Sequence, residues 1–148
     1  MANHCFGCGP DNPFGLHLHF HPEGDGVAAT FVCEERHVGW PGIQHGGITG
    51  SLLDEASGYV PYALGLFAVT AELNVSFVEA VYEGEVLQLT AKPVKKSRRI
   101  IEVEAELKTE DGRLKARSWA KMVVLSKEQQ EARGFTVPED DLPWRLEV

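Results

Sequence analysis

The stretch "GWPGIQHGGITGSLLDEASG", from Gly39 to Gly58, decides how the rest of this 148-residue chain is interpreted. From Gly46 to about Leu64, apolar residues return at three- and four-residue steps, which predicts a helix. Small residues lie on all sides of this helix, so we expect other backbone to pack closely around it. Two features are unusual for a helix: it begins with two glycines, and it carries Asp54 next to Glu55 in its middle.

On both sides of this helix the apolar residues alternate with polar ones, which is typical of strands with one buried face. Strands are expected at residues 16–20, 27–33, 72–77, 87–91, 101–107 and 114–124. The first two would form a hairpin around "PEGDG", and Asp111-Gly112 is a strong signal for another hairpin turn. We therefore predict an α+β fold, with a curved antiparallel sheet of five to six strands wrapped around one long helix.

Residues 1–148 are interpreted as a single domain, in which residues 1–14 form an N-terminal loop and residues 126–148 a C-terminal tail. The tail begins with a short helical stretch, "SKEQQEAR", and Trp144 is expected to dock it.

The net charge of −8 argues against nucleic acid as a partner, because a surface that binds phosphates normally carries the opposite sign. No apolar run approaches the ~20 residues that a membrane helix needs. The first residues show neither the basic nor the apolar part of a signal peptide. We therefore expect a cytoplasmic protein without a membrane partner.

The chain has three cysteines, Cys5, Cys8 and Cys33. A small, odd number of cysteines argues against a disulfide framework, so reduced thiols are expected. The Cys5-x-x-Cys8 spacing permits three interpretations: a plain loop, half of a zinc site, or a redox pair. Further ligands of such a site would be chosen among the nearby histidines, His4, His17 and His19. A structural zinc site usually shows a second ligand pair of similar spacing, and the sequence has none. The plain loop is the favoured interpretation, and no metal is expected.

The glycine pair Gly46-Gly47 also has two interpretations. Backbone N–H groups at the start of a helix lack partners and carry partial positive charge. Glycines leave room for a ligand oxygen to reach these groups, and a carbonyl oxygen that becomes an oxyanion would be stabilised there. The alternative is that the glycines only let the loop pass closely over the sheet.

Asp54 lies eight residues after Gly46 and therefore ~12 Å further along the helix. That separation is too large for both residues to act on one carbonyl group, since reacting groups must lie within ~3–3.5 Å. Two antiparallel helices across a dimer axis would bring the start of one to the middle of the other, giving two equal sites. Glu55 points ~100° away around the helix, so only one of the two carboxylates would face such a site. The alternative for both is an exposed helix face.

The spacing His45-Gly46-Gly47, six residues, Asp54 resembles the signature of hotdog-fold acyl-CoA thioesterases of the phenylacetyl-CoA thioesterase type. The flanking segments "CFGCGPDNPFGL", "GWPGIQHGG" and "TAELNVSF" resemble the same subgroup, and the likeness covers most of residues 5–124. It implies an enzyme that hydrolyses a small or medium acyl-CoA thioester, aromatic ones included, to a free acid and coenzyme A. It implies no separate cofactor, because coenzyme A is part of the substrate, and it implies a homodimer, alone or paired into a homotetramer.

The resemblance also implies roles for four residues. The N–H of Gly46 would polarise the thioester carbonyl, and Asp54 of the other subunit would act as general base on water or as nucleophile. His45 would hold the site near the thiol end, and Thr70 would position the attacking water.

Gly47 and Gln44 are further candidates for contacts with the substrate. Some relatives carry a polar residue, often asparagine, six positions before the histidine, where this chain has Gly39. We expect Gln44 to replace the contacts of that side chain.

The run "KKSRR" is a basic island in an acidic chain. Coenzyme A ends in a phosphorylated nucleotide, for which four residues would supply counter-charges: Lys95, Lys96, Arg98 and Arg99. The alternative is a solvated hairpin turn. The acyl pocket would be lined by Tyr59, Tyr62 and Phe67, for which core packing is an equal alternative.

Three rival functions differ in what they require. A non-catalytic hotdog module that binds acyl-CoA as a sensor or carrier would not need Asp54. Hotdog hydratases are similar to one another in using an aspartate and a histidine a few residues apart on one loop-helix segment. No histidine follows Asp54 here. A zinc-binding regulatory protein would be built on Cys5 and Cys8.

Overall fold

The computed structural model describes residues 3–134 and 144–146. Its elements in chain order are β1 (His21–Glu23), β2 (Gly26–Val32), the 3-10 turn η1 (Glu35–His37), α1 (Gly46–Ala63), β3 (Ala68–Phe77), β4 (Val86–Lys96), β5 (Ile100–Thr109), β6 (Leu114–Val124) and α2 (Lys127–Ala132). The six strands form one antiparallel sheet in the order β1-β2-β4-β5-β6-β3. The prediction of one long helix and an antiparallel sheet is confirmed.

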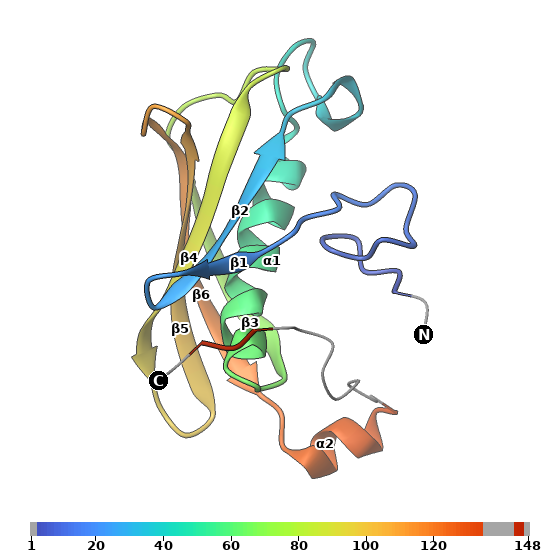
Figure 1. Cartoon of the computed structure of the whole chain (residues 1–148), viewed down its shortest axis with the longest axis vertical. Coiled ribbons are helices and arrows are strands. Elements are labelled where there is room, and N and C mark those ends of the chain that lie inside the picture. Colours follow the sequence, from blue (N-terminus) through green and yellow to red (C-terminus); the bar gives the residue numbers. More distant parts are fainter. Residues whose placement is uncertain (1–2, 135–143, 147–148) are drawn as a thin grey trace.

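Helix α1 lies along the inner face of the curved sheet (Figure 1). The apolar residues of alternate strand positions point at this helix and form one core with its buried side, among them Leu52, Leu89, Val103 and Ala120. Burial of these alternate positions is what bends the sheet around the helix, since each strand has one apolar face and only one helix is available to cover it. None of the helices that the structure describes is long and apolar enough to cross a membrane.

The predicted N-terminal hairpin is wrong in its first strand. Residues 16–20 are not a strand, and β2 pairs instead with the short β1 that follows them. Leu16 and Leu18 are buried as their alternation predicted, but their N–H groups donate to the carbonyls of Phe6 and Gly7 at 2.7 and 2.9 Å. The N-terminal loop therefore takes the hydrogen bonds that a strand would have used. This N-terminal segment passes on the side of α1 that faces away from the sheet (Figure 1).

Strand β3 is an edge strand of ten residues, and it exposes apolar side chains together with the turns at its ends: Leu66, Val69, Phe77 and Val78. Its Phe77 end lies beside the start of α1, because the ring of Phe77 is 3.7 Å from where a side chain on Gly46 would begin. Its Ala68 end lies beside the β4–β5 turn, because Ala68 is opposite Val124, whose N–H donates to the Arg99 carbonyl at 2.7 Å. These ends are ~30 Å apart along the strand.

Tail residues 144–146 are described, and Trp144 packs against the core with its ring 6.4 Å from that of Tyr59. This contact agrees with the expected docking of the tail. The short helix α2 begins at the serine of "SKEQQEAR", whose side chain accepts a hydrogen bond from the Gln129 N–H at 3.1 Å.

Candidate functional site

The start of α1 presents one free backbone donor to solvent. His45 caps the helix: its ring Nδ1 accepts a hydrogen bond from the Gly47 N–H at 2.8 Å. Its carbonyl accepts from Ile48 and Thr49 at 2.9 and 3.2 Å. Within residues 3–134 and 144–146 no group accepts a hydrogen bond from the Gly46 N–H. Of the two glycines, Gly46 therefore keeps its N–H for a ligand, while the Gly47 N–H is used inside the cap.

Two other glycine positions hold the His45 ring in place. A Cβ on Gly39 would lie 3.1 Å from the ring Cδ2, and a Cβ on Gly47 would lie 3.0 Å from the ring Nδ1. A side chain at either position would require the ring to shift by a few tenths of an ångström. The cap also fixes the tautomer: since Nδ1 accepts a hydrogen bond, a neutral His45 carries its proton on Nε2.

Asp54 is held by a hydrogen bond from the next strand. The Thr70 hydroxyl donates to the Asp54 Oδ1 at 2.8 Å, and the threonine is exposed while the aspartate is half-buried. The pairing of β3 with β6 shifts register between Thr70 and Glu72, a bulge that changes the direction of the strand at this point. The structure thus brings Asp54 and Thr70 together, and it leaves both open at the exposed edge of the sheet.

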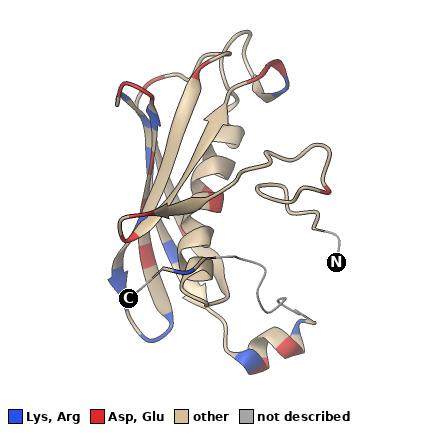
Figure 2. Cartoon of the chain, viewed as in Figure 1, with Lys and Arg blue, Asp and Glu red and all other residues tan. Residues whose placement is uncertain are grey.

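The structure does not bring all expected site residues together within one chain. Asp54 lies ~12 Å along the helix from Gly46. The basic hairpin, formed by Lys95, Lys96, Arg98 and Arg99 at the β4–β5 turn, lies near the other end of α1, and its charges are seen there in Figure 2. All four side chains are exposed, and none forms an ion pair with another residue that the structure describes.

A cavity of about 220 Å³ lies beside the free N–H of Gly46. Its walls are mostly apolar and include Phe77, and its polar side chains include Gln44 and Lys115. Gln44 is buried and its amide nitrogen donates to the Thr49 hydroxyl at 2.8 Å, while its Oε1 has no hydrogen-bond partner in the described part of the chain.

Lys115 was not a candidate in the sequence, where it occupies an outward position between Leu114 and Ala116. The register of β6 against β5 skips it, so it is the extra residue of a bulge. Its side chain is fully buried, donates to the Ala80 carbonyl at 2.8 Å and lies 3.2 Å from the Glu85 carboxylate. The bulge therefore turns a lysine inward, where it holds the segment that forms one wall of the cavity.

The three aromatic candidates for an acyl pocket are placed elsewhere. Tyr59 lies ~140° around the helix from Asp54. Its ring stacks on Phe20 at 4.3 Å and meets Tyr62 edge-on at 5.4 Å. Tyr59 and Tyr62 thus pack under the N-terminal segment, which favours the core-packing alternative for them. Phe67 precedes β3 and is half-buried.

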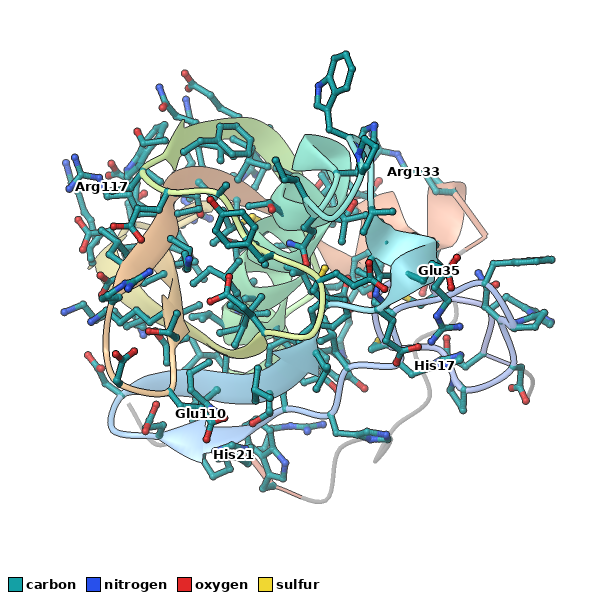
Figure 3. All side chains as sticks on the ribbon, turned by 90° about the horizontal axis from the view of Figure 1, so that it is seen from above. His17, His21, Glu35, Glu110, Arg117 and Arg133 are labelled. Atoms are coloured by element: carbon teal, nitrogen blue, oxygen red, sulfur yellow. The ribbon has the colours of Figure 1, made fainter. Side chains whose placement is uncertain are left out.

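The two N-terminal cysteines meet Glu55 rather than a histidine. One ligand atom of each of the three residues Cys5, Cys8 and Glu55 lies within 4.8 Å of the other two. Burial raises the pKa of the Cys8 thiol, and the nearby charge of Glu55 raises it further. Of the histidines considered for a zinc site, His17 is occupied by a contact between its Nε2 and the Asn12 carbonyl at 2.6 Å. Figure 3 shows His17 on the N-terminal loop, well separated from His21 on β1.

A single helix enclosed by a six-stranded antiparallel sheet, with its N terminus open to solvent, is the hotdog fold. The chain belongs to the thioesterase superfamily, because the sequence model of that family matches residues 41–116, just over half of the chain. The matched range includes the glycine pair, Asp54, Thr70 and the basic hairpin, and it leaves the N-terminal segment outside.

Relatives and solved structures agree with this assignment. A protein of Saccharolobus solfataricus, provisionally named an esterase, is 33% identical over 86 residues, which are 57% of this chain and 61% of that protein. The chain thus spans less than two thirds of this relative. A hypothetical thioesterase of Streptococcus pneumoniae, solved with coenzyme A, is 24% identical with a TM-score of 0.70 over 74% of this chain and 86% of that one. The PaaI protein of the Escherichia coli phenylacetic acid degradation operon is 20% identical, with a TM-score of 0.71 over 75% and 81%. At these identities the two structures establish the fold.

Proposed function

We propose that this protein is an acyl-CoA thioesterase of the phenylacetyl-CoA thioesterase type. It would hydrolyse a small or medium acyl-CoA, aromatic ones included, to a free acid and coenzyme A. One observation carries the proposal: a free Gly46 N–H and an Asp54 carboxylate held by Thr70 both face solvent, and they lie too far apart on one helix to act together. A hydrolase site shared by two chains would need an oxyanion donor on one chain and a reactive carboxylate on the other. Gly46 and Asp54 would supply these two groups.

The edge strand β3 supplies the way in which two chains would meet. Its ten residues leave backbone groups unpaired on one side, and such an edge pairs readily with a second copy of itself. Antiparallel pairing around a two-fold axis that sets Phe77 of one chain opposite Thr70 of the other would bring Gly46 of the first to Asp54 of the second. We therefore propose a homodimer with two equal sites, alone or as half of a homotetramer.

The chemistry follows from the two groups. With the thioester oxygen on the Gly46 N–H, the Asp54 carboxylate takes a proton from water, and the water oxygen attacks the carbonyl carbon. The developing oxyanion is stabilised by that N–H and by the helix dipole. The carbon–sulfur bond then breaks, and the proton that Asp54 took from water passes to the coenzyme A thiolate, while Nε2–H of His45 would donate a hydrogen bond to the departing sulfur. Direct attack by Asp54 would instead form a mixed anhydride that water hydrolyses to the same products.

Two features support coenzyme A as the thiol half. The exposed basic hairpin offers four cations for phosphate groups, none of them ion-paired with an acidic residue in the described part of the chain. In the antiparallel dimer this hairpin would come from the chain that supplies Asp54. The cavity of about 220 Å³ beside Gly46 has space and apolar walls for a small acyl group. A cytoplasmic location, where coenzyme A esters and reduced thiols occur together, fits the three free cysteines.

A solved relative gives independent support for the pair of side chains. The Streptococcus pneumoniae thioesterase has been crystallised with an aspartate and, separately, with a threonine 16 positions later replaced by alanine. Asp54 and Thr70 have the same spacing of 16 residues.

The first test is thiol release from a panel of acyl-CoA esters by wild type, Asp54→Asn and the control Glu104→Gln, which alters an exposed carboxylate on the outer face. We expect Asp54→Asn to lose turnover by ~10²-fold or more while coenzyme A binding and the dimer persist. The control should keep full turnover. Wild type that binds coenzyme A but releases thiol from no ester would overturn the enzyme proposal in favour of a sensor or carrier.

The two-chain site is tested by mixing two inactive variants, Asp54→Asn and Gly46→Val, under conditions in which subunits exchange. Each mixed dimer would contain one site with both groups intact. About a quarter of the wild-type activity should therefore return, because half of the dimers are mixed and half of their sites are intact. A mixture as inactive as its components, with mixed dimers demonstrated by mass, would place the site within one chain.

A further inference from the structure

The N-terminal segment is closed into a defined shape around Cys5 and Cys8. The Gly9 N–H donates to the Cys5 carbonyl at 2.9 Å, and the Cys5 N–H donates to the Asn3 side chain at 3.1 Å. A Cβ on Gly9 would lie 2.4 Å from the Cys5 nitrogen, so only glycine fits after the second cysteine. The two thiols are thus presented from one tight turn.

The same turn is fitted to Glu55 on α1, 50 residues away. A Cβ on Gly7 would lie 2.4 Å from the Glu55 carboxyl carbon, so the backbone between the two cysteines lies directly on this side chain. The Cys5 sulfur lies 3.6 and 3.8 Å from the two Glu55 oxygens. The Gly7 carbonyl also accepts from the Leu18 N–H at 2.9 Å, which fixes the turn from its other side.

Glu55 has no positive partner. No lysine, arginine or histidine of the described ranges, residues 3–134 and 144–146, lies within ion-pairing distance of it. The Cys5 thiol donates a hydrogen bond to this half-buried carboxylate, and a metal ion bound between the thiols and the carboxylate would supply the positive charge that the described residues do not.

The separation of Cys5 from Glu55 is compatible with a zinc ion bound to both. Zinc–sulfur bonds of ~2.3 Å and zinc–oxygen bonds of ~2.0–2.2 Å place neighbouring ligand atoms ~3.5–3.8 Å apart. The Cys5 sulfur lies 3.6 Å from the nearer Glu55 oxygen, which falls in this range, and one ligand atom each of Cys5, Cys8 and Glu55 lies within 4.8 Å of the other two. Thiolates favour zinc over magnesium and calcium, which prefer sites built from oxygen ligands alone.

We propose that Cys5, Cys8 and Glu55 bind one zinc ion, with water in the fourth position, and that this ion fastens the N-terminal segment onto α1 next to Asp54. On binding, each thiol releases its proton to solvent as its sulfur bonds the metal, and the Glu55 carboxylate bonds it as it is. Cys5 and Cys8 lie outside residues 41–116, so two of the three ligands come from a segment that the family match does not cover, while Glu55 lies within it. It places one carboxylate of the Asp54-Glu55 pair in each of two different sites.

The test measures metal binding and needs no enzyme activity. The full chain is treated with a chelator under a reductant, checked for its fold by circular dichroism, and titrated with zinc; the bound metal is counted per chain, and cobalt serves as a spectroscopic probe. We expect about one zinc per chain and the absorption bands of thiolate-bound tetrahedral cobalt. Zinc should also protect Cys5 and Cys8 from alkylation in peptides mapped by mass.

Matched variants assign the ligands. Glu55→Gln and Cys8→Ser should each weaken zinc binding by more than the ~10–100-fold typical of losing a group that only orients a ligand. Two control variants should bind as wild type does: Glu104→Gln changes an exposed carboxylate, and Cys33→Ala changes the buried third cysteine.

Three results would overturn the proposal. Folded wild type that takes up no zinc would do so, and so would zinc binding that Glu55→Gln and Cys8→Ser leave unchanged. The third is a Cys5–Cys8 disulfide that persists in the reductant, because it would leave no thiolate to bind a metal. If a variant fails to fold, the wild-type stoichiometry and the alkylation map decide the question alone. None of these readouts depends on whether the protein hydrolyses thioesters.

Discussion

Replacing Thr70 with valine removes one hydroxyl group while keeping the branched shape of the side chain. That hydroxyl donates to the Asp54 Oδ1 at 2.8 Å, and no other hydrogen bond reaches this carboxylate from a side chain that the structure describes. A hydrogen bond to a charged group contributes ~1.5–3 kcal/mol, and the exposure of Thr70 places this one at the lower end. Since ~1.4 kcal/mol corresponds to a factor of ten in rate, kcat should fall ~10-fold if the bond aims the carboxylate.

The assay is thiol release at saturating and at low substrate, with thermal unfolding measured beside it. KM should stay near the wild-type value, because the hydroxyl is not proposed to bind the ester. The matched variant Thr70→Ser keeps the donor and should retain most of the turnover. Full kcat in Thr70→Val would refute the role of the hydrogen bond. Equal loss in Thr70→Ser and Thr70→Val would assign the effect to the methyl group instead.

Three further outcomes are expected. Gly46→Ala would place a methyl group 3.7 Å from the Phe77 ring, an ordinary contact, so the free energy of unfolding should stay level or rise by up to ~1 kcal/mol. Turnover should nevertheless fall at least ~10-fold, because the methyl group narrows the approach of the thioester oxygen to the Gly46 N–H, and one oxyanion donor contributes ~10²–10³ in rate. Unchanged kinetics would exclude Gly46 from the site. Arg98→Gln should raise KM for coenzyme A esters several-fold yet leave a thioester of a short thiol without phosphates unaffected, which distinguishes phosphate binding from a folding defect. Burial, followed by the charge of Arg36, lowers the pKa of His37 against the opposing effect of Glu34. The unfolded chain therefore takes up a proton near pH ~6.5, whereas the folded chain takes it up only at lower pH. The free energy of unfolding, measured with urea, should fall from pH 7 towards pH 5, and it should fall less in His37→Gln. Identical pH profiles of wild type and His37→Gln would contradict this.

The helix and the central strands could be predicted because their signals are local. A three- and four-residue apolar period after "HGG" defined α1 to within about one residue of its observed end, and alternation located β3 to β6. The N-terminal hairpin could not be predicted, since alternation at residues 16–20 reports burial and says nothing about hydrogen bonds. His17 adopts a φ of 51°, and the N–H groups on either side of it donate to the loop rather than to a strand.

The site was predictable only in part. Helix geometry pointed to Gly46 and to one of the two carboxylates Asp54 and Glu55, while the choice of Asp54 and the candidate Thr70 came from the family resemblance. The use of the Gly47 N–H by the His45 ring could not be read from the sequence, because it depends on a side-chain rotamer. Lys115 was missed because a bulge reverses the face on which a strand residue lies, and alternation assumes that no bulge is present.

Asp54 and Glu55 show why two adjacent carboxylates in an apolar helix need not share one explanation. A step of one residue turns ~100° around a helix, so each side chain faces a different neighbour. Asp54 faces Thr70 and the open edge strand, while Glu55 faces the turn of Cys5 and Cys8 on another side of the helix. If both proposals hold, the metal ion fixes α1 at Glu55. The neighbouring Asp54 of the same chain then acts on the ester bound at Gly46 of the other chain. Loss of zinc should then lower kcat while the dimer persists. The paired β3 edges would still hold the two chains together, but the Asp54 carboxylate would be less well positioned.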